Sequence, residues 1–265
     1  MKFYRSKIIL LTYLVLIAII ISLPTVYILR ERQMDTFIAT QYKLSPVKQS
    51  SNIKIGVIGD SWVAGKKLDL SISNELKSSG INAEVVSIGH SGAKSREIFR
   101  DLLSSSSNLY SSNSLLLDDN IYFLVVVAGV NDAAGHIGKD FYTHHIKNIV
   151  SVANSYSKFP IVVELPEFDI EKSADSYPSM AKHYLYQVLF DGGKTDIISD
   201  YRNSLKTSLD ATKLNYKLIP FDPIVKNYSD SINLYANPWH LNEEGYKLLG
   251  TYIGKSIVVE CQNRL

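Results

Sequence analysis

Residues 53–62 read IKIGVIGDSW, an apolar run that ends abruptly at a glycine followed by two polar residues. Short apolar runs with such boundaries are typical of buried β-strands. Four further runs have the same character and occupy residues 83–88, 121–128, 160–165 and 216–221. Continuous apolar strands of this kind occur in parallel sheets that are covered on both faces.

The segments between these runs have helical periodicity. Stripes of mainly apolar residues share a helix face, at Leu68, Ile72 and Leu76, at Ile98, Leu102 and Leu103, at Phe141, His145, Ile149 and Val152, and at Tyr246, Leu249 and Ile253. Strands that alternate with helices predict right-handed βαβ crossovers. We therefore expect an α/β fold, a three-layer α/β/α sandwich with a parallel sheet, in one domain at residues 52–265.

The N-terminal segment is different in character. Residues 8–29 contain no charged side chain and consist mainly of Ile, Leu and Val. As a helix they extend about 33 Å, enough to cross a hydrocarbon core of about 30 Å. A cleaved signal peptide has a shorter apolar region followed by small residues, and that pattern is absent. We expect an uncleaved transmembrane anchor within residues 1–30 and a polar tether at residues 31–51.

Basic residues set the expected orientation of this anchor. Three precede the span, whereas two follow it and are partly offset by Glu31. The positive-inside bias therefore predicts a single-pass protein with a cytoplasmic N-terminus and its domain on the exocytoplasmic side.

Composition excludes several classes of function. The net charge is +2 and the basic residues are scattered, so nucleic-acid binding is not expected. Cys261 is the only cysteine, which excludes an intrachain disulfide and predicts a partly buried structural thiol. His136 and the pair His144–His145 lack the spacing and the carboxylate of zinc hydrolases. We expect no metal and no cofactor.

Polar or glycine-rich segments follow three of the strands. They read Gly59-Asp60-Ser61-Trp62, Gly89-His90-Ser91-Gly92 and Gly129-Val130-Asn131-Asp132, and a fourth polar segment, Asn237-Pro238-Trp239-His240, precedes the last helix. Ligand sites in α/β sheets form beyond the carboxyl ends of the strands. A serine hydroxyl needs an adjacent base, which His240 can supply to Ser61. Acyl transfer also needs oxyanion donors, and Ser61, Gly89 and Asn131 can provide them.

The four segments, in this order, resemble the SGNH (GDSL) hydrolase superfamily over about residues 53–250. The resemblance implies a flavodoxin-like sheet and an esterase that works through an acyl-serine intermediate. It also implies that Ser61 is the nucleophile, that His240 is the general base, and that Ser61, Gly89 and Asn131 form the oxyanion hole.

One position departs from the pattern of this superfamily. An aspartate usually stands three residues before the histidine, where this chain has Asn237. The same replacement in a chymotrypsin-type triad lowers kcat by about 10⁴-fold. Asn237 could accept the hydrogen bond from His240, or a backbone carbonyl or one of the carboxylates Asp222 and Asp230 could replace it. The third alternative is a weakened or inactive relative that binds glycan or a membrane partner. An Asn-Pro step is also typical of a turn.

The expected substrate is an acyl ester, and the tether places it at the cell envelope. By analogy with anchored members of the superfamily, we expect O-acetyl groups on a surface polysaccharide. An O-acyltransferase that passes the acyl group to a sugar hydroxyl would use the same residues.

Overall fold

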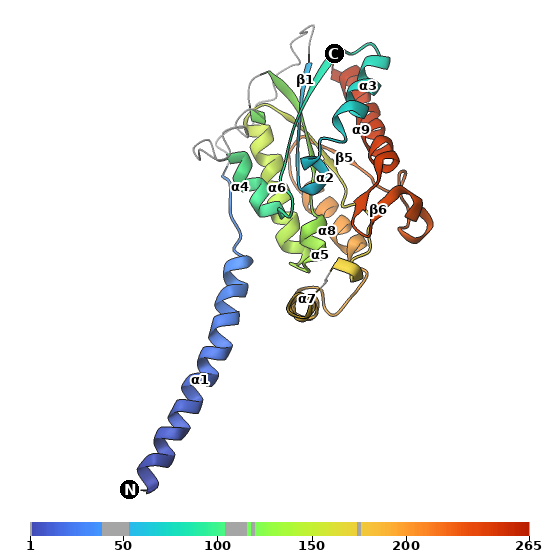
Figure 1. Ribbon diagram of the computed structural model, residues 1–265. Coiled ribbons are helices and arrows are strands. Elements are labelled where there is room, and N and C mark those ends of the chain that lie inside the picture. The colour runs from blue at the N-terminus through green and yellow to red at the C-terminus, as the bar shows by residue number, and fades with distance from the viewer. Residues whose placement is uncertain (1, 39–52, 104–115, 118–119, 174–175, 265) are drawn as a thin grey trace. The chain divides into compact units, whose positions relative to one another are not determined.

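Five parallel strands form the central sheet of the computed structural model (Figure 1). They are β1 (Ile53–Gly59), β2 (Ala83–Gly89), β3 (Ile121–Val127), β4 (Phe159–Val163) and β5 (Lys217–Ile219), and they lie in the order β2-β1-β3-β4-β5. This is the flavodoxin-like order, in which the chain reverses direction across the sheet at β1 and β3. The predicted fold class and all five predicted strands are confirmed, although β4 and β5 are shorter than expected.

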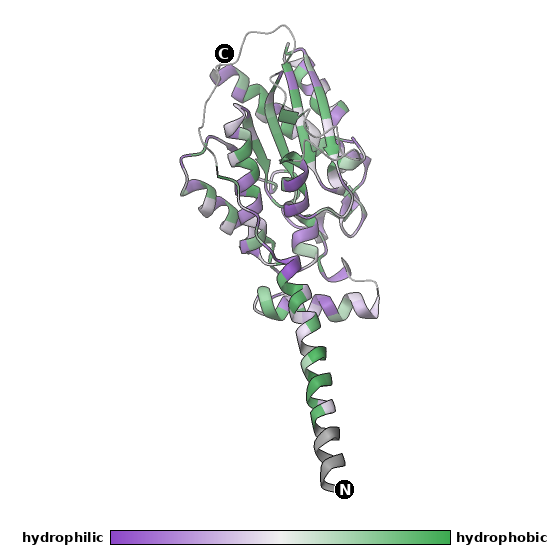
Figure 2. Cartoon of the chain, turned by 90° about the vertical axis from the view of Figure 1, so that its left-hand side faces the viewer, coloured by the Kyte–Doolittle hydropathy of each residue, from purple (hydrophilic) through white to green (hydrophobic). Residues whose placement is uncertain are grey.

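The structure describes residues 2–38, 53–103, 116–117, 120–173 and 176–264. Two helices, α3 (Asp69–Ser78) and α9 (Glu243–Arg264), pack against each other. A second group packs together and contains α4 (Ser95–Leu103), α6 (Lys139–Ser155) and α8 (Ile198–Asp210). The strands between the helices are almost wholly apolar, whereas the helices contain both polar and apolar residues (Figure 2). The result is the expected three-layer sandwich.

The helical stripes predicted on α3, α6 and α9 are buried. The stripe predicted on α4 is wrong at Leu103, which is partly exposed. Its place in the core is taken by Phe99, which is buried beside Ile98 and Leu102. Positions 98, 99 and 102 lie on one face of a helix with 3.6 residues per turn, whereas 103 is rotated away from it.

Helix α1 (Lys2–Glu31) forms a compact unit at Met1–Asp35, separate from the unit Thr36–Leu265. Residues 11–31 of this helix are long and apolar enough to cross a membrane. The anchor predicted at residues 8–29 therefore corresponds to a continuous apolar helix, whereas membrane insertion and orientation stay predictions. Most of the tether predicted at residues 31–51 lies outside the described residues.

The sheet register brings three strand ends together. Gly59 at the end of β1 pairs with Gly89 of β2 and with Val127 of β3. The next segments are α2 (Ser61–Ala64), the loop before α4, and α5 (Val130–Ala134). All three leave the sheet at the carboxyl ends of the strands.

A small antiparallel hairpin, β6 (Tyr235–Asn237) and β7 (His240–Leu241), was not predicted. Its turn at Pro238 and Trp239 agrees with the turn expected for the Asn-Pro step.

Candidate active site

The fold brings Ser61 and His240 together although they are 179 positions apart in the sequence. Ser61 is the first residue of α2, and His240 begins β7. The Ser61 Oγ lies 2.8 Å from the His240 Nε2, which is hydrogen-bonding distance. Ser61 therefore has an imidazole in position to take its proton.

Asn237 contacts the imidazole of His240 on the side away from Ser61. Its Oδ1 lies 3.1 Å from His240 Nδ1 and 3.1 Å from the backbone nitrogen of Trp239. A backbone N–H can only donate, so the amide must turn its oxygen toward Trp239. The same oxygen then faces Nδ1, which must carry a proton to donate to it. This leaves Nε2 of His240 unprotonated and able to accept the Ser61 proton.

Trp62 links the two segments that carry this pair, a role that sequence analysis missed. Its indole Nε1 donates to the Trp239 carbonyl oxygen at 2.9 Å, and its ring is buried. Phe221 and Tyr246 contact the ring edge-to-face, with centroids 6.0 and 5.8 Å away. Trp62 thereby fixes the loop that carries His240 relative to α2. The only signal in the sequence was a tryptophan next to each of the two reactive residues.

The candidate site opens into a cavity of about 700 Å³. Its walls include Ser61, Asn237 and His240, and also Asn131 from α5 and Gly92 from the loop after β2. Asn131 Nδ2 donates to the Ala93 carbonyl oxygen at 3.0 Å, which holds the amide against that loop.

Gly89, the third expected oxyanion donor, is not among the residues that line this cavity. It is the last residue of β2, and its α-carbon is packed against α2. A Cβ added to Gly89 would lie 2.3 Å from the Ala64 nitrogen. Glycine is therefore required at this position for close packing of two backbones. Gly92, three residues later, has φ +79° and lines the cavity, so the structure differs from the sequence-based expectation here.

Two buried aspartates brace the loops of the site. Asp60 accepts a hydrogen bond from the Trp62 backbone N–H at 3.0 Å. Asp132 accepts from the Ser95 N–H at 2.9 Å and from the Ser95 hydroxyl at 2.6 Å. Burial raises the pKa of each carboxyl to about 7. Asp132 thus joins the start of α4 to α5, and Asn131 is its neighbour.

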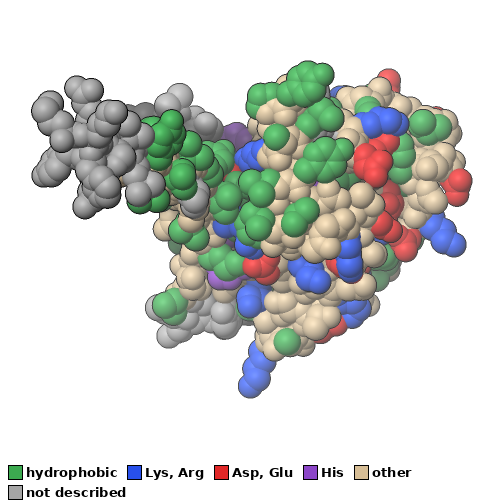
Figure 3. Space-filling view, turned by 90° about the horizontal axis from the view of Figure 1, so that it is seen from below, with side chains coloured by type: hydrophobic (Ala, Val, Ile, Leu, Met, Phe, Trp, Pro, Cys, Tyr) green, Lys and Arg blue, Asp and Glu red, His purple; other side chains and the backbone are tan. Residues whose placement is uncertain are grey.

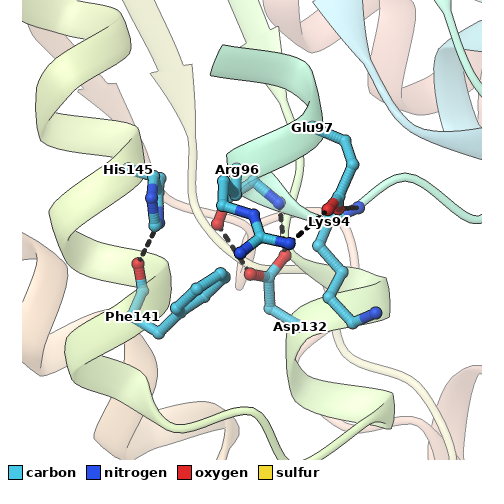
Figure 4. Close-up of polar contacts among 7 residues, drawn as sticks. Lys94, Arg96, Glu97, Asp132, Phe141 and His145 are labelled. Atoms are coloured by element: carbon cyan, nitrogen blue, oxygen red, sulfur yellow. Dashed lines mark hydrogen bonds and ion pairs between the residues drawn. The ribbon is translucent and has the colours of Figure 1, made fainter. Parts of the chain in front are cut away.

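Figure 4 shows the surroundings of Asp132. Lys94, Arg96 and Glu97 belong to the start of α4 and its preceding residue, and Asp132 approaches them from α5. Glu97 accepts a hydrogen bond from the Lys94 backbone N–H at 2.9 Å, which orders the first turn of the helix. The loop that holds Gly92 is therefore fixed at its helix end by two carboxylates.

Electrostatics favour the neutral form of the imidazole. Burial lowers the pKa of His240, and the positive charge of Lys67 lowers it further. Lys67 lines the same cavity, with its ammonium 5.0 Å from the centre of the Tyr246 ring. A lowered pKa keeps the candidate base unprotonated at more acidic pH.

The carboxylates considered as substitutes for Asn237 are not seen at His240. Asp222 instead pairs with Arg202 at 2.7 Å. The residue that faces Nδ1 is Asn237 itself, which corresponds to the first of the three alternatives.

The histidines weighed as metal ligands have other partners. His136 Nδ1 lies 2.7 Å from Asp191 and its Nε2 lies 3.1 Å from His183, while His145 Nδ1 donates to the Phe141 carbonyl oxygen at 2.8 Å (Figure 4). Within the part of the chain that the structure describes, no three potential ligands are grouped to hold a metal ion.

Comparison with known proteins gives similarity in structure only. No family model matches the chain, and no curated protein is similar to it in sequence. A lipase/acylhydrolase from Enterococcus faecalis has a TM-score of 0.56 at 18% identity, covering 78% of this chain and 96% of that chain. A lipolytic protein of the G-D-S-L family from Desulfitobacterium hafniense has a TM-score of 0.53 at 17% identity, and the alignment covers 77% of this chain and 99% of that chain.

A variant of the acetyl-xylooligosaccharide esterase Axe2 from Geobacillus has a TM-score of 0.53 at 13% identity, covering 77% of this chain and 94% of that chain. The alignments span nearly the whole of each of these proteins, at identities that show a shared fold. The chain therefore has the α/β fold of the GDSL lipases and acylhydrolases.

Proposed function

We propose that this protein is a serine esterase of the SGNH type. The observation that carries the proposal is the chain of contacts from Ser61 Oγ through His240 to Asn237 Oδ1, at 2.8 and 3.1 Å. A serine, an imidazole and an oriented acceptor at hydrogen-bonding distances are what an activated acyl-transfer nucleophile requires. The shared fold of acylhydrolases and esterases supports the same reaction class.

The reaction follows from these positions. His240 Nε2 takes the Ser61 proton while Oγ attacks the ester carbonyl carbon, and a tetrahedral oxyanion forms. The imidazolium then gives its proton to the leaving alkoxide as the ester bond breaks, which leaves an acyl-serine. Water, deprotonated by the same nitrogen, releases the acid and restores Ser61. Asn237 would stabilise the imidazolium through a dipole in place of a full negative charge.

The oxyanion would be held by the N–H of Ser61, the N–H of Gly92 and the Nδ2 of Asn131. An Asn amide nitrogen has two protons, and donation to Ala93 uses one of them. We assign Gly92 to this role in place of Gly89, because Gly92 lines the cavity.

Fluorophosphonate labelling tests the nucleophile. The probe should attach to the purified full chain at Ser61, as identified by mass spectrometry of peptides. Labelling and turnover of p-nitrophenyl acetate should both vanish in Ser61→Ala. The control is Ser91→Ala, which alters another serine of the same cavity and should keep its label. An unlabelled wild-type chain would instead favour a non-catalytic binding protein.

The substrate we propose is an O-acetyl ester of a cell-envelope carbohydrate. Support comes from the fold shared with the acetyl-xylooligosaccharide esterase and from the apolar N-terminal helix. Incubation of acetylated glycan with the enzyme should release free acetate. If labelled acetyl donor and unacetylated glycan gave net acetylation, the protein would be an O-acyltransferase.

We also propose a single-pass topology with the N-terminus in the cytoplasm and the folded domain outside it. Protease added to intact spheroplasts should degrade the domain, whereas protection of the domain until the membrane is opened would reverse the orientation.

A further inference from the structure

Helix α7 (Tyr177–Phe190) presents an apolar face to solvent. Tyr177 is 90% exposed, Val188 66% and Tyr184 60%, and the same face carries Met180, Leu185 and Leu189. Tyr177, Met180, Tyr184 and Val188 follow one another at spacings of three or four residues and share one side of the helix, with Leu185 and Leu189 beside them. Figure 3 views the molecule from below, the side on which α7 lies in Figure 1, and apolar side chains gather there.

The opposite face of α7 is held against the domain by polar contacts. His183 approaches the buried His136 at 3.1 Å, and His136 contacts Asp191, just after the helix, at 2.7 Å. The Gln187 side chain donates to the Gly193 carbonyl oxygen at 3.3 Å, which closes the turn that follows the helix and holds Asp191 in place. This network fixes the rotation of the helix about its axis, so the apolar face is turned outward by specific contacts.

An uninterrupted apolar face of this size on a soluble surface marks a site of interaction. The composition of α7 indicates the kind of surface that covers it. No acidic residue occurs between Tyr177 and Phe190. An exposed apolar face that includes two tyrosines and lacks acidic side chains suits a helix that lies at the interface of a bilayer.

A bilayer is also within reach of this helix if the anchor proposed above is correct. About 20 residues separate the end of α1 from the start of β1, a length that extends at most about 70 Å. A membrane-bound α1 therefore keeps the domain permanently close to the same bilayer. Binding of a second weak element becomes an intramolecular event at high effective concentration.

We propose that α7 is an interfacial helix that docks the folded domain on the bilayer in which the same chain is anchored. Docking would have a consequence for the candidate active site. Ser179, Lys182 and His183 on the inner face of α7 line a hollow that shares Gly92 and Asn131 with the walls of the main cavity. The candidate site would then open close to the lipid headgroups and act on membrane-proximal esters.

The test uses the full chain in nanodiscs of phosphatidylcholine and phosphatidylglycerol. The only native thiol, Cys261, is buried, and burial raises its pKa to about 11, so it reacts slowly. Single variants Val188→Cys, Leu16→Cys and Leu70→Cys would carry an environment-sensitive fluorophore on α7, on α1 and on α3. Leu70 is 70% exposed and belongs to a helix other than α7.

Lipids that carry a doxyl quencher should reduce the emission at positions 188 and 16 by about half, because both labels would lie in the acyl region. Emission at position 70 should not change. Replacing Tyr184, Leu185 and Leu189 together by serine in the Val188→Cys chain should abolish the quenching and leave turnover of p-nitrophenyl acetate unchanged.

Two results would overturn the proposal. Quenching at 16 without quenching at 188 would mean that α1 is anchored and α7 stays in water. Blue-shifted emission at 188 without quenching by doxyl lipids would mean that protein, such as a second copy of the chain, covers the helix. The soluble ester reports catalysis separately, so a failure of docking and a failure of the esterase proposal are distinguishable.

Discussion

Replacing Asn237 by aspartate should increase kcat. The amide oxygen lies 3.1 Å from His240 Nδ1, so a carboxylate there would place its charge about 4 Å from the imidazolium that forms during attack. Two charges at 4 Å attract by about 1 kcal/mol in water and about 4 kcal/mol at an effective dielectric constant of 20. Asn237 is exposed to solvent, so screening favours the lower part of this range.

An increase of roughly 5- to 30-fold in kcat follows, from about 1–2 kcal/mol of added stabilisation of the transition state. This is far below the 10⁴-fold effect in chymotrypsin-type enzymes, because that loss includes an incorrect imidazole tautomer. Here the Trp239 N–H already turns the oxygen of Asn237 toward His240, so the tautomer is correct. The variant therefore gains only the electrostatic stabilisation of the imidazolium.

The assay is the steady-state hydrolysis of p-nitrophenyl acetate between pH 5 and 8. In Asn237→Asp the negative charge should raise the pKa of His240, so the acid limb of the kcat profile should move to higher pH. As the matched control, Asn237→Ala removes the acceptor and should reduce kcat roughly tenfold, the value of about one hydrogen bond. A fall of kcat in Asn237→Asp would refute the reasoning, because the amide would then have a role that a carboxylate cannot fill.

Four further outcomes follow from the structure. Lys67→Gln removes a charge that lowers the pKa of His240, so this pKa should rise and the acid limb of the pH–rate profile should move to higher pH; an unmoved limb would contradict the assignment. Trp62→Phe keeps an aromatic ring beside Phe221 but loses the bond to Trp239, and kcat should fall roughly tenfold while the protein stays folded by circular dichroism. Gly89→Ala should cost about 3 kcal/mol in urea unfolding, because the new Cβ meets the α2 backbone. Gly92→Ala, whose Cβ would meet open space, should cost only about 1–2 kcal/mol from its positive φ, and equal costs at both positions would show that the packing argument is wrong. Finally, burial raises the pKa of Asp132 from 3.8 to about 7. Between these two pH values the folded state keeps a proton on Asp132 that the unfolded state has released. The free energy of unfolding should therefore fall as pH rises from about 4 to about 7, and Asp132→Asn should show a smaller fall in urea titrations; an identical pH dependence would mean that Asp132 is ionised throughout.

Much of the fold was predictable because the signals are local. The apolar runs that became β1 and β3 end at glycines, and their length and content of β-branched residues identify them as buried strands. Leu103 was assigned wrongly because both it and Phe99 are apolar, and only packing against the sheet selects the buried member of such a pair. The β6–β7 hairpin was missed because its strands are only three and two residues long.

The candidate site was predictable in its residue types and less so in its geometry. Ser61, Asn131 and His240 stood out because each lies in a polar segment at a strand end or before a helix. Gly89 was predicted because it directly follows an apolar run, and the sequence does not reveal which of two nearby glycines faces a cavity. Trp62 and the network of His136, His183 and Asp191 were missed because their partners are distant in the sequence.

Local patterns along the chain specify the periodicity of the elements, the parallel α/β class, the apolar N-terminal helix and the residue types that could activate an ester. These are properties of neighbouring residues, and the chain carries them before it folds. Folding is needed to bring Ser61 Oγ within 2.8 Å of His240 Nε2, to turn the oxygen of Asn237 toward the imidazole, and to leave the apolar face of α7 exposed. Such features depend on contacts between distant segments, whose distances and orientations are fixed only when the sheet register and the packing of the helices are complete.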